Sequence, residues 1–595
     1  MKKGLFFIFL IACVLIIGGY LFIRFSLQSS VNKDAKGLST EKTGSDTSKV
    51  SNSPLDLRPL FIARMQQLIK NSSNGLYDLS VGDMEIDILQ STVELKDVTL
   101  TPADTAMAFL VKSNQAPDDV FKASFETVRI EGINLDEAVS SKTMDFKIIR
   151  LVQPVIEVRH KKRSYNENDD KEDFSKRILK QMEKIAIGKL IIEKGTIISY
   201  NDDKKGKQNK LNNVSVNMMD ILIDSATRKD KDRFLFSRAA TLSFQDYVTK
   251  TTDGLYNLKI GGVTIKAPQQ VITLQNLSIQ SLFSKEQFVK KMANSKELYD
   301  FTAPSITVKN VNWWRLLNEE QLVADELKLS GGKLKIYLDR SLPPKNKMGS
   351  FPNQLIMKIP MKINIAKTKV NNLDFSYEEY NPVSKQSGIV YIDDIALDIT
   401  NLNNMQVKGK AAKPLTVKGS SLFMRTVPLT AEFNFSMANY KSGKFSAKFS
   451  AGGFDGSLVN SFAMPMGMAK IEKGMIQKVE AQVQGDQWGA NGDVLIMYKD
   501  LKLSLLEKDK DEKKLDKKGF TTLVANLFIL KKDNPKDGKE VRNEKAEFKR
   551  IPEGGFFMLI WKTVMIGTLK TIGAPTKIAK KTVNTTNKNN KGIEY

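Results

Sequence analysis

Few residues in this chain could carry nucleophilic, redox or metal chemistry. Its 595 residues include one cysteine, Cys13, and one histidine, His160. A single cysteine allows neither a disulfide nor a Cys-X-X-Cys redox pair, and a single histidine allows neither an HExxH motif nor a two-histidine metal centre. A Ser-His-Asp triad remains arithmetically possible. However, His160 opens the basic run 160–163 after a strand-like segment, which is typical of a solvated loop.

Phosphate-binding loops are also missing from the sequence. It contains no Walker A motif and no GxGxxG, and Gly332-Lys333 is followed by Leu334 rather than by Ser or Thr. We therefore predict that the protein is not an enzyme and uses neither a metal nor a cofactor. The alternative, an exported hydrolase built around His160, would lose its activity on His160→Ala substitution.

The chain is strongly basic, with 91 Lys+Arg against 67 Asp+Glu and a formal charge of +24. The lysines are dispersed beside acidic residues and form no localised motif, so we expect no nucleic-acid partner. Most of this charge fits solvated sheet faces, and the surplus suits anionic lipid headgroups or an anionic envelope surface. The 41% hydrophobic content is that of an ordered protein.

Residues 4–23 form an uncharged apolar stretch, long enough to span a bilayer as one helix. Lys2 and Lys3 precede it, and the positive-inside tendency then keeps the short N-terminal tail in the cytoplasm and exports the rest. Two alternatives stay open: Leu10–Cys13 resembles a lipobox that would make Cys13 a lipidated N-terminus, and an ordinary cleaved signal is the other. The polar stretch after the anchor predicts a flexible tether.

A tandem duplication follows the tether. Gly75–Gly82 returns as Gly254–Gly261, an offset of 179 residues, and Ile187–Tyr200 returns as Ile365–Tyr377. We predict the following division of the chain: 1–26 transmembrane anchor, 27–54 tether, 55–240 first β unit with a leading helix, 241–428 second β unit, 429–550 closing β segment, 551–576 apolar or amphipathic helix, and 577–595 disordered basic tail.

Strict alternation of apolar and polar residues dominates both copies. It is clear in Asp83–Ile88, Lys333–Asp339 and Ile395–Ile399, and it predicts strands with one apolar face. Helical patterns are few, at about 60–69, Phe174–Ile185 and Ser284–Leu298. With many one-sided strands and no second apolar layer, the sheet has to cover its apolar face by folding over itself.

The apolar faces of these strands predict either a groove for acyl chains or an ordinary closed core. The candidate groove residues are Met84, Ile86, Ile88, Ile156, Val158, Leu334, Ile336, Leu338, Ile395, Leu397, Phe433, Phe435, Phe445 and Phe449. The helix-length stretch Phe556–Ile572 has two readings as well. Its Phe556, Phe557 and Trp561 predict a membrane-interface helix, whereas the alternative is a helix packed across the end of the sheet.

Several segments resemble the AsmA-like family of bacterial envelope proteins. They are Pro154–Val158, Ile187–Tyr200 with its counterpart Ile365–Tyr377, Gly489–Leu501, and the late helix ending in Gly567–Lys570. The similarity is to the short, domain-of-unknown-function branch of this bridge-like lipid-transfer superfamily. It implies a mainly β fold, in which an elongated, curled, taco-like and antiparallel-rich sheet encloses an apolar groove, with a few short helices and one N-terminal transmembrane helix.

The resemblance also implies phospholipid movement between the inner and outer membranes. We therefore expect a single-pass protein of the bacterial inner membrane, anchored through residues 4–23, with most of the chain in the periplasm. Its partner would be a phospholipid or another acyl-chain lipid. The alternative is a structural or regulatory scaffold that holds an outer-membrane assembly factor at the inner membrane, with an envelope protein as partner and no lipid transfer.

Overall fold

The computed structural model describes residues 58–580 with internal gaps. The gaps are 74, 88, 133–142, 167–182, 205–206, 228–229, 252, 406–411, 467–468, 509–519, 524–530, 575 and 577–578. The chain divides into two compact units: unit 1 holds residues up to Thr249 together with Ile260–Ile272, and unit 2 holds Lys250–Lys259 and the chain from Thr273 onward. The predicted anchor and tether, and nearly all of the predicted tail, lie outside the described residues.

Unit 1 is built mainly from strands. Its helices and strands are α2 (Arg58–Ser72), β1 (Tyr77–Ser80), β2 (Asp83–Asp87), β3 (Thr92–Pro102), α3 (Asp104–Lys112), β4 (Asp119–Glu131), β5 (Thr143–Val152), β6 (Val155–His160), β7 (Lys184–Asn201), β8 (Lys207–Ile223) and β9 (Ala239–Lys250). The next two strands, β10 (Tyr256–Lys266) and β11 (Val271–Ser281), each have residues in both units.

Unit 2 follows the same plan and ends in a longer helix. Its elements are α6 (Lys285–Lys291), β12 (Leu298–Lys309), α7 (Trp313–Asn318), β13 (Gln321–Asp339), α8 (Pro352–Ile356), β14 (Lys362–Asn381), β15 (Gln386–Asn403), β16 (Leu415–Phe423), β17 (Val427–Phe435), β18 (Phe445–Ala451), β19 (Phe454–Asp455), α9 (Asn460–Ala463), β20 (Ala469–Asp486), β21 (Gly489–Lys508), β22 (Phe520–Leu523), β23 (Asn543–Lys549) and α10 (Phe556–Thr571).

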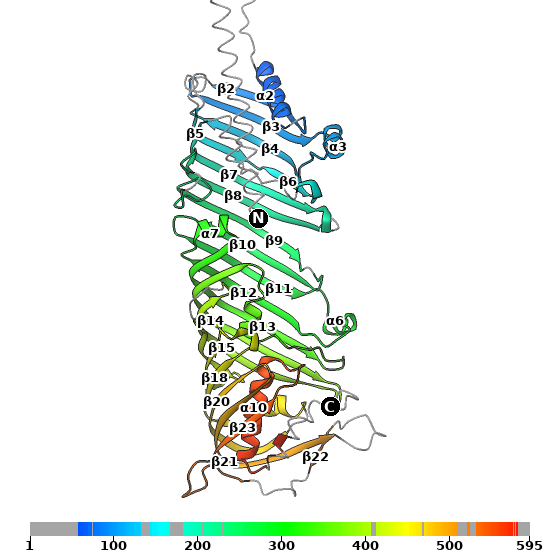
Figure 1. Ribbon diagram of the computed structural model, residues 1–595, viewed down its shortest axis with the longest axis vertical. Coiled ribbons are helices and arrows are strands. Elements are labelled where there is room, and N and C mark those ends of the chain that lie inside the picture. The colour runs from blue at the N-terminus through cyan, green and yellow to red at the C-terminus, as the bar shows by residue number, and fades with distance from the viewer. Residues whose placement is uncertain are drawn as a thin grey trace, which may run out of the picture. The chain divides into compact units, whose positions relative to one another are not determined.

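The prediction of a mainly β protein with a few short helices is confirmed, and the strands belong to one large mixed sheet (Figure 1). Most neighbouring strands are antiparallel, as between β14 and β15 or β20 and β21. Parallel pairing occurs where β5 and β6 meet β7, and where β13 meets β14. Parallel neighbours need a crossover connection, and residues 340–361 provide the crossover from β13 to β14.

The backbone repeats at the offset found in the sequence. β3 and β11 begin 179 residues apart, at Thr92 and Val271, and β7 and β14 begin 178 apart. An irregularity within the strands repeats too, because Asp97 on β3 and its counterpart Asn276 on β11 both have positive φ, of 50° and 52°. β5 and β6 together correspond to the single strand β13. The two copies therefore share their strand order, including the parallel pairing.

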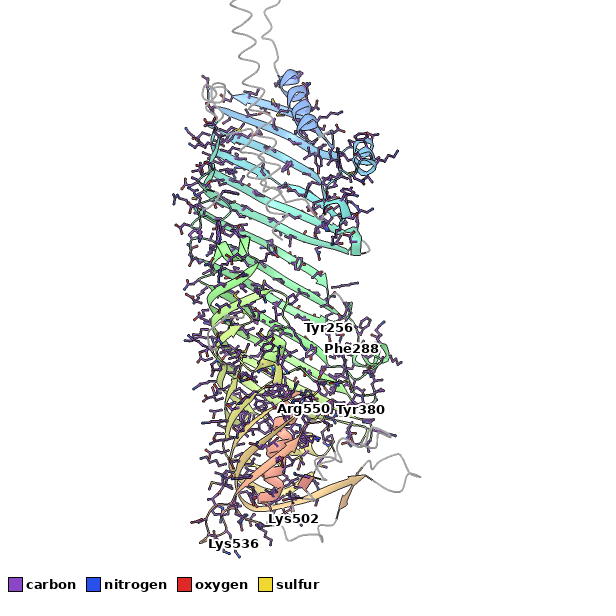
Figure 2. All side chains as sticks on the ribbon, in the orientation of Figure 1. Tyr256, Phe288, Tyr380, Lys502, Lys536 and Arg550 are labelled. Atoms are coloured by element: carbon purple, nitrogen blue, oxygen red, sulfur yellow. The ribbon has the colours of Figure 1, made fainter. Side chains whose placement is uncertain are left out.

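Unit 2 has its largest apolar core at its C-terminal end. α10 packs against β20, β21 and β23 (Figure 1). The described side chains of its inner face are buried with those of the strands. Gly567 allows this close approach, since a Cβ at this position would lie 2.5 Å from Cβ of Val494 on β21. A smaller cluster holds α6 beneath β10, where the rings of Tyr256 and Phe288 lie 6.3 Å apart (Figure 2).

The predicted helices are only partly reproduced. α2 covers the pattern at 60–69, and α10 matches Phe556–Ile572 to within one residue. α6 is shorter than Ser284–Leu298, because Ser284 caps it and Leu298 already begins β12. Of Phe174–Ile185, the described end belongs to β7 and the rest lies outside the described residues. None of the helices in the described ranges combines the length and hydropathy needed to cross a bilayer.

Candidate functional site

One face of the sheet in unit 2 lines a large cavity. Its volume is about 3270 Å³, roughly three times the upper end of the range for sites that bind small molecules. Strands β13–β18, β20 and β21 supply one wall. α10, the crossover 340–361 and α9 supply the other side. The cavity therefore lies between the sheet and the segments that cross its apolar face.

Apolar side chains run in rows across the strands that form the cavity wall. Residues paired across neighbouring strands point to the same face, so the register determines each row. Leu334 on β13 pairs with Phe375 on β14, which pairs with Ile392 on β15. A second row runs from Val417 on β16 to Phe433 on β17. The alternating pattern of each strand thus becomes one continuous apolar surface.

These side chains are neither fully packed nor fully exposed. Leu334, Phe375, Ile392, Val417 and Phe433 all line the cavity and are all half-buried. In a closed core such residues would be almost inaccessible, because protein interiors leave few spaces larger than a water molecule. The cavity therefore presents unfilled apolar surface.

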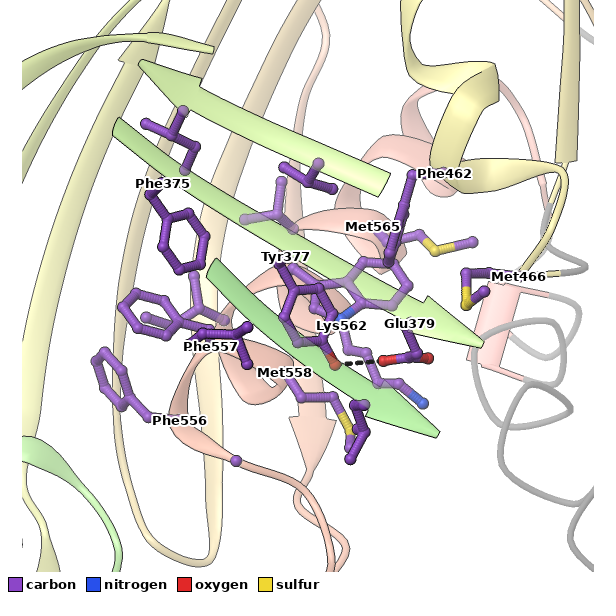
Figure 3. Close-up of a pocket in the computed structure, with 18 of the residues that line it drawn as sticks. Phe375, Tyr377, Glu379, Phe462, Met466, Phe556, Phe557, Met558, Lys562 and Met565 are labelled. Carbon is purple, nitrogen blue, oxygen red and sulfur yellow. Dashed lines mark hydrogen bonds between the residues drawn. The ribbon is translucent and has the colours of Figure 1, made fainter. Parts of the chain in front are cut away.

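An aromatic cluster closes the wall beside the first turn of α10. Phe556 is only 6% exposed, and its ring centroid lies 4.9 Å from that of Phe445 and 5.1 Å from that of Phe351. The pairs meet edge to face, an arrangement that aromatic rings favour. Phe557, the next residue, lies beside Phe556 at the wall (Figure 3) and is 69% exposed.

Arg550 links the crossover 340–361 to the residues just before α10 through hydrogen bonds. Its guanidinium donates to backbone oxygens of Lys347 at 2.8 Å, Gly554 at 2.8 Å and Gln487 at 3.1 Å. The same group stacks over the ring of Phe351, 4.4 Å from its centroid. Burial lowers the pKa of Arg550 to about 10, so it remains charged at neutral pH.

Charged side chains gather at the end of the apolar wall where β13 and β14 finish. Glu379 is 3% exposed and accepts a hydrogen bond from the Tyr377 hydroxyl, while its other carboxylate oxygen pairs with Arg340 Nε at 2.5 Å. Burial, together with the nearby Glu379 charge, raises the pKa of Tyr377 well above its ordinary value, so its hydroxyl stays protonated.

Lys562 reaches the same region from α10, as Figure 3 shows. It is 1% exposed, and its ammonium lies 5.5 Å from the ring centroid of Phe548. Burial lowers the pKa of Lys562 to about 7; Arg340 adds to this effect and Glu379 opposes it. The lining as a whole is basic. Its described residues include nine lysines and arginines but only three glutamates.

Most of the predicted groove residues in unit 2 lie along this cavity. Those that line it are Leu334, Ile336, Leu338, Ile395, Leu397, Phe433, Phe435 and Phe449. Phe445 instead packs in the aromatic cluster against Phe351 and Phe556.

The predicted groove residues in unit 1 are placed differently. Met84, Ile156 and Val158 are buried, Ile86 is 38% exposed, and Ile88 lies outside the described residues. The structure therefore brings together predicted groove residues from the second β unit and from the closing β segment, and the unit 1 set stays a prediction.

The three residues predicted for a membrane interface are also separated by their environments. Phe556 is buried and Phe557 is exposed. Trp561 is half-buried, with its ring edge-on to that of Phe462 at 6.3 Å.

His160 lies at the end of β6 rather than in a solvated loop, with Nδ1 2.6 Å from Asp119 Oδ1. In the described part of the chain no group of His, Cys, Asp and Glu could hold a metal ion.

Sequence reasoning missed the charged end of the cavity. Strand β14 carried a signal: Phe375, Tyr377, Glu379 and Asn381 share one face at period two, and the last two are polar. An apolar face that becomes polar near the strand end indicates where the cavity changes character. Lys562 gave a weaker signal, as a lone cation in the first half of an apolar helix.

Comparison with known proteins adds no assignment: no family model matches this chain, and neither does any curated protein sequence.

Proposed function

We propose that this protein binds acyl chains of phospholipids along the cavity of unit 2 and moves them without chemical change. The observation that carries the proposal is the unfilled apolar surface: rows of half-buried Leu, Ile, Val and Phe side chains around about 3270 Å³. A small polar ligand would gain little from this surface. A flexible hydrocarbon chain would be buried by it along its whole length.

The energy scale agrees with reversible transfer. Burial stabilises hydrocarbon by ~0.8 kcal/mol per methylene, so a chain of about a dozen methylenes gains roughly 10 kcal/mol relative to water. A membrane offers a similar gain. Moving the lipid between a bilayer and the cavity is then close to balanced, and the protein only has to shield the chain from water during the passage.

The cellular setting is part of the same proposal. Residues 4–23 would anchor the chain in a bacterial inner membrane, with the rest in the periplasm, as in the AsmA-like proteins that the sequence resembles. In this view the apolar cavity of unit 2 supplies the lipid groove that the resemblance implies. Phospholipid would move along it between the two envelope membranes.

The direct test is native mass spectrometry of the full chain purified in a mild detergent, searching for bound phospholipid. Two adjacent substitutions on β15 provide a matched pair. Ile399→Glu puts a charge into the cavity wall, whereas Thr400→Glu puts the same charge on the exposed opposite face. We expect Ile399→Glu, like Ile336→Glu on β13, to abolish phospholipid retention, and Thr400→Glu to leave it intact.

Retention that survives both cavity substitutions in folded protein would refute the cavity as the lipid site. A wild-type protein that carries no lipid, yet crosslinks to an envelope protein, would instead favour the scaffold alternative. The melting temperature of each variant separates loss of lipid from loss of fold.

A further inference from the structure

We propose that segment 355–362, which runs from the end of α8 to the first residue of β14, is a docking surface for an anionic phospholipid bilayer. This inference rests on the proposed function and extends it from the lipid inside the cavity to the membrane that supplies or receives that lipid.

Segment 355–362 exposes several large apolar side chains. Leu355 is 50% exposed, Ile359 39% and Met361 43%, and no other seven-residue stretch among the described residues exposes three such side chains. Single exposed apolar side chains are ordinary on protein surfaces, whereas a contiguous group marks a site that binds a membrane or another macromolecule. The segment therefore has the surface of a binding site.

A buried side chain holds the backbone of the segment in place. Asn404 is 2% exposed, and its side-chain amide donates to the carbonyl oxygens of Ile359 at 3.2 Å and Met361 at 2.9 Å. The amide oxygen of Asn404 accepts from the backbone N–H of Ile363 at 2.8 Å. These three hydrogen bonds fix the segment while the Ile359 and Met361 side chains remain in solvent. A surface that is already ordered binds without a large entropic cost.

The charge of the crossover favours a bilayer over a protein partner. Between residues 340 and 362 the chain has five basic residues and no acidic residue. Two of the five pair with glutamates from other segments, and the other three, Lys345, Lys358 and Lys362, are exposed. Lysines attract anionic lipid headgroups, while neighbouring apolar side chains enter the membrane interface. Segment 355–362 combines both properties.

The same segment adjoins the cavity. Leu355, Ile356 and Lys358 line the cavity, and Leu355 also keeps half of its surface in solvent. A residue with both properties lies at the rim. Ile359 and Met361 follow closely in the chain and are not part of the lining. A bilayer docked on the segment would therefore meet the rim, so that an acyl chain could pass between membrane and cavity with little exposure to water.

The test holds the full chain in phosphatidylcholine nanodiscs, mixes it with extruded vesicles and floats the vesicles on a density gradient. We expect the wild type to bind phosphatidylglycerol-rich vesicles at least about tenfold better than pure phosphatidylcholine vesicles. The double substitution Ile359→Ser with Met361→Ser should weaken binding at least about tenfold, because two large side chains no longer enter the bilayer.

Met475→Ser on β20 is the matched control. Met475 is 51% exposed, lies outside the segment and does not line the cavity, so we expect its replacement to leave vesicle binding unchanged. A second variant, Lys358→Gln with Lys362→Gln, tests the charge and serves if the first does not fold. It should bring the preference for phosphatidylglycerol close to unity.

Phospholipid retention in detergent, measured by native mass spectrometry, separates this proposal from the proposed function. Because Ile359 and Met361 lie outside the lining, we expect their double variant to retain phospholipid as the wild type does. Unchanged vesicle binding by the folded double variant, or equal binding of the wild type to both kinds of vesicle, would overturn the docking surface while the acyl-chain proposal stands. Crosslinking of the segment to a protein, without vesicle binding, would overturn it as well. A wild type that docks on vesicles but retains no phospholipid would instead overturn the proposed function.

Discussion

Replacing Lys562 with methionine should stabilise unit 2, and the gain should depend on pH. The ordinary pKa of a lysine is 10.5, and burial lowers that of Lys562 to about 7. Each unit of pKa difference between the folded and unfolded states corresponds to about 1.36 kcal/mol. The charged Lys562 therefore costs the folded protein up to roughly 5 kcal/mol, and methionine of similar length removes this cost.

The sign of the pH dependence follows from proton binding. Between about pH 7 and pH 10.5 the unfolded lysine holds a proton that the folded lysine has released, so the stability of the wild type rises with pH in this window. Below it the full cost is present, and above it the cost disappears. Lys562→Met should thus gain most at about pH 6 and little above pH 10.

Urea unfolding followed by tryptophan fluorescence is a suitable assay. All four tryptophans, Trp313, Trp314, Trp488 and Trp561, belong to unit 2, so the signal reports on that unit alone. Lys570→Met controls for the loss of a lysine from α10. A stability difference that does not change between about pH 6 and pH 10, or a less stable Lys562→Met, would refute the reasoning.

Three further predictions concern the same end of the protein. Arg550→Met should destabilise unit 2 by at least ~3 kcal/mol and expose the crossover to proteolysis, because three backbone oxygens lose a charged donor; an unchanged urea midpoint would contradict this. Gly567→Val should cost ~3 kcal/mol by overpacking against Val494, and a variant as stable as the wild type would show that α10 can shift. Phe557→Ser should change stability by less than ~0.5 kcal/mol yet weaken binding to phospholipid vesicles in a flotation assay; undiminished vesicle binding would argue against an interfacial role for this exposed ring.

Much of the β architecture could be predicted from local pattern. Strict alternation in Asp83–Ile88 predicted β2, and alternation in Lys333–Asp339 predicted the part of β13 whose Leu334 and Ile336 line the cavity. Such predictions succeed because the side-chain direction in a strand is fixed by parity alone. The helix at Phe556 was equally local, since its apolar stretch is bounded by glycine residues.

The nature of the cavity could not be predicted in the same way. Whether an apolar face is covered depends on which segment crosses it, and the crossover 340–361 and α10 (Phe556–Thr571) are about two hundred residues apart in the sequence. Lys562 lies within an apolar helix, and its environment is set by Arg340 and Glu379, about two hundred residues earlier in the chain. Alternation also gives no measure of how fully a face is packed, so Phe445 joined a closed cluster while Phe449 remained on the cavity wall.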